Sequence, residues 1–202
     1  MESQLLLPAF YLPPVSYFHT IKSAGLHLLL DRFEHYPKQT YRTRAKIGTA
    51  NGILELFVPI VHGRKEHVAM KDVRINYEFD WQRLHWMSLQ TAYRSSAFFE
   101  FYEDDFADFY TKKHSFLFDF NVLQLELILK CLKLNCTLTY TESYQDVQSG
   151  PDLRRAIHPK KQNLWADHKP YHQVFQDKNG FLSDLSIVDL LFNQGPQSKS
   201  YL

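Results

Sequence analysis

The first 30 positions of the chain alternate between short apolar runs and breaker residues. Gln4 to Leu7 reads as a buried strand stopped by proline, Val15 to Ala24 has room for a short helix, and Leu26 to Leu30 is apolar again. A strand, a helix and a strand in so short a span predict a βαβ unit whose two strands are parallel neighbours.

A β-hairpin is predicted next. Thr40 to Gly48 and Ile53 to Ile60 have extended character and flank Asn51 and Gly52. Asn-Gly between extended segments is a strong hairpin signal, because both residues accept positive φ angles. A further strand is expected at Asp72 to Asn76. We expect the hairpin and the βαβ unit to form one mixed sheet.

Helical periodicity follows, and three to five helices are expected to pack on this sheet, in a mixed α/β fold. The predicted helices are Val15 to Ala24, Trp81 to Tyr93, about Ser96 to Phe109, one beginning at Asn121 with Gln124 in a capping box, and a last one with Ser186 and Asp189 in a capping box, ended by Gly195. Thr137 to Tyr140 is expected to return as a strand. Residues 142–177 lose periodicity, so we expect a long irregular loop region within a single domain spanning 1–202.

Charge and composition exclude several classes of protein. The chain has 23 Lys and Arg against 22 Asp and Glu, a net charge of +1, which gives no electrostatic reason to expect a nucleic-acid partner. Its apolar stretches are interrupted by charged residues, so no transmembrane segment is predicted. No secretory signal is recognisable, and two cysteines, Cys131 and Cys136, are too few to stabilise the fold through disulfide bonds. These features predict a soluble, cytoplasmic protein.

The motifs of common cofactor and metal sites are missing from the sequence. Its 7 glycines form neither G-x-G-x-x-G nor a P-loop, and neither G-x-S-x-G nor H-E-x-x-H occurs. His168 and His172 are four residues apart, but Pro170 lies between them and makes a shared helical face doubtful. We therefore predict no cofactor and no metal site.

Asp31 and a basic segment are the first candidates for a binding site. Asp31 is expected at the carboxyl end of the second strand, the edge of an α/β sheet where ligands bind. Residues 37–46 carry four positive charges, from Lys38, Arg42, Arg44 and Lys46. In an extended strand the last three would share one face and bind a phosphate or carboxylate. The alternative is a solvated or charge-protected edge strand.

A second set of candidates lies on the predicted helix from Trp81 to Tyr93. His85 is a candidate acid or base because its ordinary pKa is near neutrality. Trp81 and Tyr93 could form the walls of a pocket for a sugar or a nucleobase, although aromatic residues at this spacing more often belong to the core. Catalysis is accordingly assigned to His85 and Asp31, and substrate binding to Lys38, Arg42, Arg44, Trp81 and Tyr93.

Several of these segments together resemble the WbqC-like family of bacterial proteins, in its Bacteroides-type form. The matching segments are Tyr11-Leu12-Pro13-Pro14-Val15-Ser16-Tyr17-Phe18, Lys38-Gln39-Thr40-Tyr41-Arg42-Thr43-Arg44, Asn51-Gly52 with Val58-Pro59-Ile60, Trp81-Gln82-Arg83-Leu84-His85-Trp86, Ala92-Tyr93-Arg94-Ser95-Ser96 with Phe98-Phe99, and Leu185 to Pro196. The family often has Asn where this chain has Thr43, and Pro where it has Ala97. The first difference removes a polar group beside the arginines.

The resemblance implies a role in making or decorating a surface polysaccharide such as O-antigen. Two hypotheses remain open. The first is a transferase-like enzyme that moves an acyl, aminoacyl or sugar group from an activated sugar or carrier-linked donor, and it implies a small-molecule or carrier-linked, phosphate-bearing ligand. The alternative is a non-catalytic binding or scaffolding protein that uses an aromatic surface. The sequence gives no indication of the oligomeric state.

Overall fold

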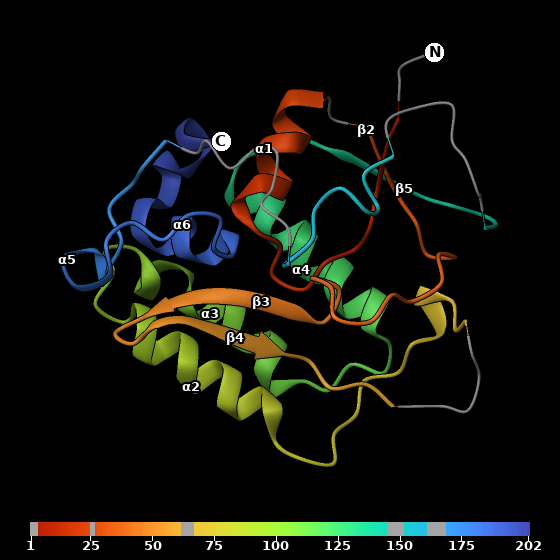
Figure 1. The fold of residues 1–202 in the computed structure, drawn as a ribbon, viewed down its shortest axis with the longest axis horizontal. Helices are drawn as coiled ribbons and strands as arrows, with labels where there is room; N and C mark the ends of the chain where they lie inside the picture. Colours follow the sequence, from red (N-terminus) through yellow and green to blue (C-terminus); the bar gives the residue numbers. More distant parts are fainter. Residues whose placement is uncertain (1–3, 25–26, 62–66, 145–151, 161–168) are drawn as a thin grey trace.

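The computed structural model describes residues 4–24, 27–61, 67–144, 152–160 and 169–202 (Figure 1). The strands are β1 (Leu5–Leu7), β2 (His27–Leu30), β3 (Arg44–Thr49), β4 (Gly52–Phe57) and β5 (Thr137–Tyr140). The helices are α1 (Val15–Ala24), α2 (Trp81–Tyr93), α3 (Phe99–Thr111), α4 (Leu117–Cys131), α5 (Gln176–Asn179) and α6 (Ile187–Gln194), with 3-10 turns η1 (Met70–Asp72) and η2 (Gly195–Tyr201). None of the described helices is long and apolar enough to cross a membrane.

The βαβ unit predicted from the start of the chain is confirmed. β1 and β2 pair in parallel, with Leu5 opposite Leu28, and α1 connects them. β5 joins the other side of β2, also in parallel, so the strand order is β1-β2-β5. All three side chains of β1 are buried, and so are Leu28 and Leu30 of β2, as expected for a parallel sheet covered on its faces.

The hairpin is confirmed, and with it the mixed α/β fold class, but β3 and β4 pair as a sheet of their own within the described residues. Other segments occupy strand edges at which the hairpin and the parallel sheet could have joined. Asp152 bridges to β1 at Leu6, and the Lys46 carbonyl of β3 accepts a hydrogen bond from the Ser186 amide. β3 begins at Arg44, so the expectation that the strand starts at Thr40 is wrong. In the turn, Gly52 has a φ of 94°.

α4 runs through the middle of the molecule, between the parallel sheet and the hairpin (Figure 1). It begins at Leu117, so the predicted start and capping box at Asn121 are wrong. The Asn121 amide is instead buried in the helix and donates to the carbonyls of Ala9 (3.0 Å) and Arg42 (2.8 Å). α4 therefore connects the end of β1 to the segment before β3.

Two other local predictions need correction. Asp72 to Asn76 is not a strand: it begins in η1 and continues with isolated bridges at Arg74 and Ile75. Ser186 does cap α6, but the Asp189 side chain turns into the core. Of the loop expected over 142–177, the described part contains the Asp152 bridge and the start of α5, while residues 145–151 and 161–168 lie outside the described residues.

Candidate functional site

Polar and charged side chains gather at the carboxyl end of the parallel sheet. Asp31 directly follows β2, Thr141 directly follows β5, and Asp152 bridges to β1. Because the strands are parallel, their carboxyl ends meet at one edge, which is where open α/β sheets bind ligands. Asp31 therefore lies where the sequence predicted it, at the carboxyl end of the second strand.

The Asp31 carboxylate is fully buried and accepts four hydrogen bonds from the part of the chain that the structure describes. Its Oδ1 accepts from the Phe33 amide (3.0 Å), the Glu34 amide (2.9 Å) and the Thr141 hydroxyl (3.0 Å). Its Oδ2 accepts from Nη1 of Arg154 at 2.7 Å. These bonds fix the turn after β2 and with it the backbone of Arg32.

Arg42 and Glu34 form a second buried pair at this edge. Nε and Nη2 of Arg42 donate to the two carboxylate oxygens of Glu34 at 2.6 and 2.5 Å. Burial raises the pKa of Glu34, and the Arg42 guanidinium opposes that rise. Nη2 of Arg42 also donates to the Arg154 carbonyl at 3.1 Å, which links the two pairs. The charge of Arg42 is therefore already balanced inside the protein.

Arg154 completes the network from the far side of β1. It reaches Asp31 with Nη1 and binds Asp152 with Nε (3.0 Å) and Nη2 (2.6 Å). Sequence reasoning missed Arg154, because it lies in a polar region without periodicity. It also missed Glu34, the partner of Arg42.

A pocket of about 390 Å³ opens beside this network. Two cations line it, beside the carboxylates of Asp119 and Glu126. They are Arg32, whose Nε donates to the Thr141 carbonyl at 3.0 Å, and Lys71 of η1, whose Nζ also pairs with the exposed Asp72 at 2.9 Å. Both stack on the ring of Phe33, at 5.3 and 5.4 Å from its centroid. Phe118 and Tyr140, whose ring centroids are 6.0 Å apart, form an aromatic wall. The size is typical of a small-molecule site, and the lining suits an anion attached to an apolar or planar body.

The sequence could have indicated part of this pocket. Arg32 follows Asp31, so the argument that placed Asp31 at the sheet edge applies to it as well. Lys71 carries no such signal, because η1 is distant from β2 in the sequence and joins the edge through tertiary contacts, one of them the hydrogen bond from the Lys71 amide to the Arg32 carbonyl at 2.9 Å.

The predicted basic row is not assembled on one strand face. Arg42 precedes β3 and is buried, Arg44 pairs with Glu55 at 2.5 Å, and Nζ of Lys46 donates to the Pro159 carbonyl at 2.8 Å. Lys38 is exposed. Arg42 does not follow the expected alternation because the strand starts four residues later than predicted, at Arg44.

His85 lies in the core, within a separate network. It is 6% exposed, and its ring donates to the Phe57 carbonyl. Nδ1 is then the acceptor, and the Tyr11 hydroxyl donates to it at 2.8 Å, while Tyr110 bonds to Tyr11 at 3.0 Å. Burial lowers the pKa of His85 to about 4. The imidazole is therefore neutral at physiological pH.

Trp81 and Tyr93 are fully buried as well. Trp81 packs edge-on against His85 at 5.1 Å, and the Tyr93 hydroxyl donates to Asp189 at 2.9 Å. Within the described residues, Asp31, Arg44 and His85 thus belong to three different hydrogen-bond networks. Asp31 and Arg42 are brought together through Glu34 and Arg154, and Trp81 and His85 through the packing of their rings. The binding and catalytic roles assigned to these residues stay predictions.

His168, considered as a metal ligand from the sequence, lies outside the described residues.

Most of the chain is similar in sequence to known proteins. The sequence pattern described as the WbqC-like protein family matches residues 9–163, which include Asp31, Arg42 and Arg154. A relative from Mycobacterium tuberculosis, named "Uncharacterized protein Rv1507c", is 25% identical over 228 aligned residues, which cover 100% of this chain and 98% of the relative. No solved structure matches the chain.

Proposed function

We propose that this protein, which belongs to the WbqC-like protein family, binds a phosphate-bearing small molecule or carrier-linked donor at the carboxyl edge of its parallel sheet. One observation carries the proposal: Arg32 and Lys71 line the same 390 Å³ pocket as the aromatic wall of Phe118 and Tyr140. Guanidinium and ammonium groups bind phosphate oxygens through charge-assisted hydrogen bonds. Asp31 holds the turn that carries Arg32.

The finer part of the proposal is a transferase-like role in surface-polysaccharide synthesis, in which an acyl, aminoacyl or sugar group is transferred to a sugar. The family resemblance implies that role. Asp31 and His85 remain the proposed acid–base residues. Because Asp31 is bound to Arg154 and His85 to Tyr11, a base role for either needs a ligand that displaces the present partner.

Titration calorimetry with inorganic pyrophosphate and a nucleoside diphosphate sugar tests the binding site. We expect Arg32→Ala and Lys71→Ala each to weaken binding about tenfold or more, because each removes a charge-assisted contact. Arg83→Ala, which removes an exposed cation from α2, is the matched control and should bind as the wild type does. Equal affinity in all three variants would refute the proposed site.

An exposed surface on α2 favours the alternative, a non-catalytic binding protein. Leu84 and Met87 are 56% and 48% exposed and lie three residues apart on this helix. Met87 also lines a shallow depression with Thr91 and Arg94. Pull-down with wild type and with Leu84→Glu/Met87→Glu distinguishes the two functions: loss of a partner protein, with small-anion binding intact, supports the alternative.

A further inference from the structure

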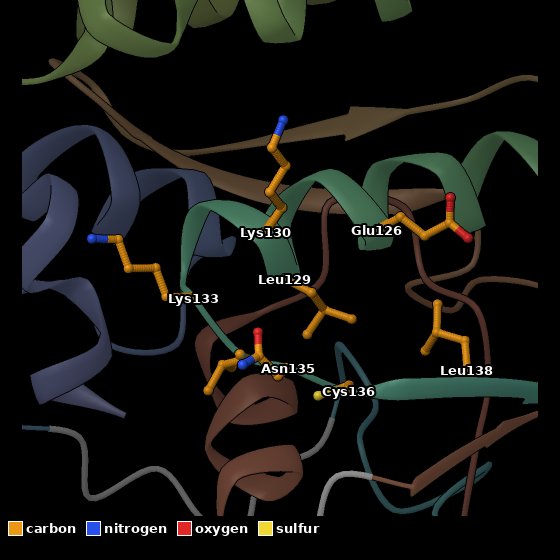
Figure 2. Close-up of a pocket in the computed structure, with 8 residues that line it drawn as sticks. Glu126, Leu129, Lys130, Lys133, Asn135, Cys136 and Leu138 are labelled. Carbon is orange, nitrogen blue, oxygen red and sulfur yellow. The ribbon is translucent and has the colours of Figure 1, made fainter.

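The pocket at the sheet edge continues as a groove along α4. Asp119, Leu123 and Glu126 line the first pocket, and Glu126, Leu129 and Lys133 line a second one of about 540 Å³ (Figure 2). The spacing of three and four residues from Asp119 to Leu129 places these side chains on one face of α4, over about 15 Å at 1.5 Å per residue. Lys133 follows the end of the helix at Cys131. We call the two pockets together the α4–β5 groove.

The opposite wall of the groove is the last strand of the parallel sheet. Leu138 and Tyr140 of β5 line the second and first pocket respectively, and their two-residue spacing puts both side chains on the same face. The Thr141 amide donates inward to Leu30 of β2, so the amides of Leu138 and Tyr140 point to the outer edge. Within the described residues, no strand pairs with this edge. An extended chain in the groove could therefore use main-chain hydrogen bonds.

The charges of the groove are unevenly distributed. Arg32 and Lys71 line the first pocket together with the carboxylates of Asp119 and Glu126, whereas Lys130 and Lys133 line the second pocket with Glu126. At the far end, Lys130 projects away from the strand, while Leu129 and Leu138 project into the space between helix and strand (Figure 2). A matching ligand places one anionic group on Arg32 and Lys71 and continues as an uncharged, extended body, because further negative charge in the first pocket would meet Asp119 and Glu126.

Apolar surface along the groove fits such a body. Leu123 and Tyr140 are 44% and 38% exposed, which is unusual for large apolar side chains that flank a concave surface. A chain that covers them removes this surface from water, which favours binding. An acidic peptide does not satisfy the charge pattern, whereas a neutral chain of amide and methylene groups with a terminal phosphate does.

We propose that the α4–β5 groove binds the phosphopantetheine-type arm of a carrier. The phosphate contacts Arg32 and Lys71, the amides of the arm pair with the free edge of β5, and the thiol end lies near Leu134 and Leu138. This assignment rests on the proposed function, since it uses the same anion site, and it names the class of donor: a group carried as a thioester.

Titration calorimetry with free 4′-phosphopantetheine, pantetheine and inorganic phosphate tests the assignment on the full chain. Two tryptophan variants separate the arm from the phosphate. Asn135→Trp fills the second pocket from an exposed position, and Thr137→Trp places the same side chain on an exposed position that does not line the groove. Because both positions are exposed, both variants should fold, which thermal unfolding verifies.

We expect phosphopantetheine to bind at least about tenfold more tightly than phosphate. Asn135→Trp should abolish that advantage and leave phosphate binding unchanged, while Thr137→Trp changes neither. If phosphopantetheine binds no better than phosphate, or if Asn135→Trp has no effect, the groove assignment is wrong while the anion site stands. If Arg32→Ala changes the binding of no anion, the proposed function itself fails.

Discussion

Nη1 of Arg154 lies 2.7 Å from Oδ2 of Asp31, across 123 positions of the sequence. The two side chains are 10% and 0% exposed. This contact ties the segment after the Asp152 bridge to the end of β2, over the end of β1. It therefore holds together the edge at which we place the ligand.

Replacing Arg154 should destabilise the protein strongly. Arg154→Met leaves the Asp31 carboxylate buried without its cation, at a cost of about 3–5 kcal/mol in the free energy of unfolding. Urea denaturation measures it. Arg155→Met, at the exposed neighbouring position, should change the free energy by less than about 0.5 kcal/mol. A similar value for both variants would contradict a structural role for the contact.

Asp189 predicts a pH dependence of stability. Its carboxylate is 2% exposed and accepts from Tyr93 (2.9 Å), Tyr171 (2.8 Å) and Gln173 (2.9 Å). Burial raises its pKa above the usual 3.8 despite these three bonds. The folded state thus binds this proton more tightly than the unfolded state does.

The stability that protonated Asp189 contributes is fully present below the usual value of 3.8 and is lost as pH rises through the raised pKa of the folded state. Relative to Asp189→Asn, the wild type should therefore lose stability as pH rises through this range and keep a constant difference above it. Urea denaturation of both proteins across pH gives that difference. A difference that stays flat, or that grows in favour of the wild type as pH rises, would contradict the shift.

The hydroxyl groups that donate to Asp189 allow a separate test of how much its hydrogen bonds contribute to stability. Tyr171→Phe removes one donor from a buried carboxylate and should cost about 1–3 kcal/mol in the free energy of unfolding. Tyr144→Phe is the matched control, because Tyr144 is 46% exposed. Equal effects of the two substitutions would mean that the bond to Asp189 contributes nothing.

His85 should titrate far below an ordinary histidine. Burial lowers its pKa from 6.5 to about 4, so its contribution to stability is complete above about pH 6.5 and is lost as pH falls toward 4. NMR titration of the imidazole signal, assigned by its loss in His85→Gln, should give a midpoint near 4. A midpoint near 6.5 would contradict the effect of burial on this imidazole.

Local sequence signals predicted the elements that local forces determine. α2 has the bounds expected from its periodicity, and the βαβ unit follows from apolar runs separated by breakers. Asn121 misled the prediction because a polar residue after an apolar stretch resembles a cap, whereas its amide binds carbonyls 79 and 112 positions away. Arg154 was missed as the partner of Asp31 for the same reason, since the two lie 123 positions apart. Glu34 is only eight positions from Arg42, but the segment between them has no regular spacing that would indicate the pair.

The last prediction concerns Gly195, where α6 ends. The residue has a φ of 51°, and a Cβ there would lie 2.5 Å from ring atoms of Phe98, which precedes α3. The Phe98 amide donates to the Phe192 carbonyl at 2.9 Å, so the ring cannot move freely away from α6. Gly52→Ala is the matched control, because Gly52 also has a positive φ but no atom within 4 Å of the added Cβ.

Gly52→Ala should therefore report backbone strain alone, about 1–2 kcal/mol, and Gly195→Ala should cost about 1–3 kcal/mol more through overpacking. Urea denaturation of both variants gives the two values. In a Phe98→Ala background the clash disappears, and the cost of Gly195→Ala should fall to that of Gly52→Ala. If the background makes no difference, the close packing of Phe98 against the end of α6 is not what requires glycine at this position.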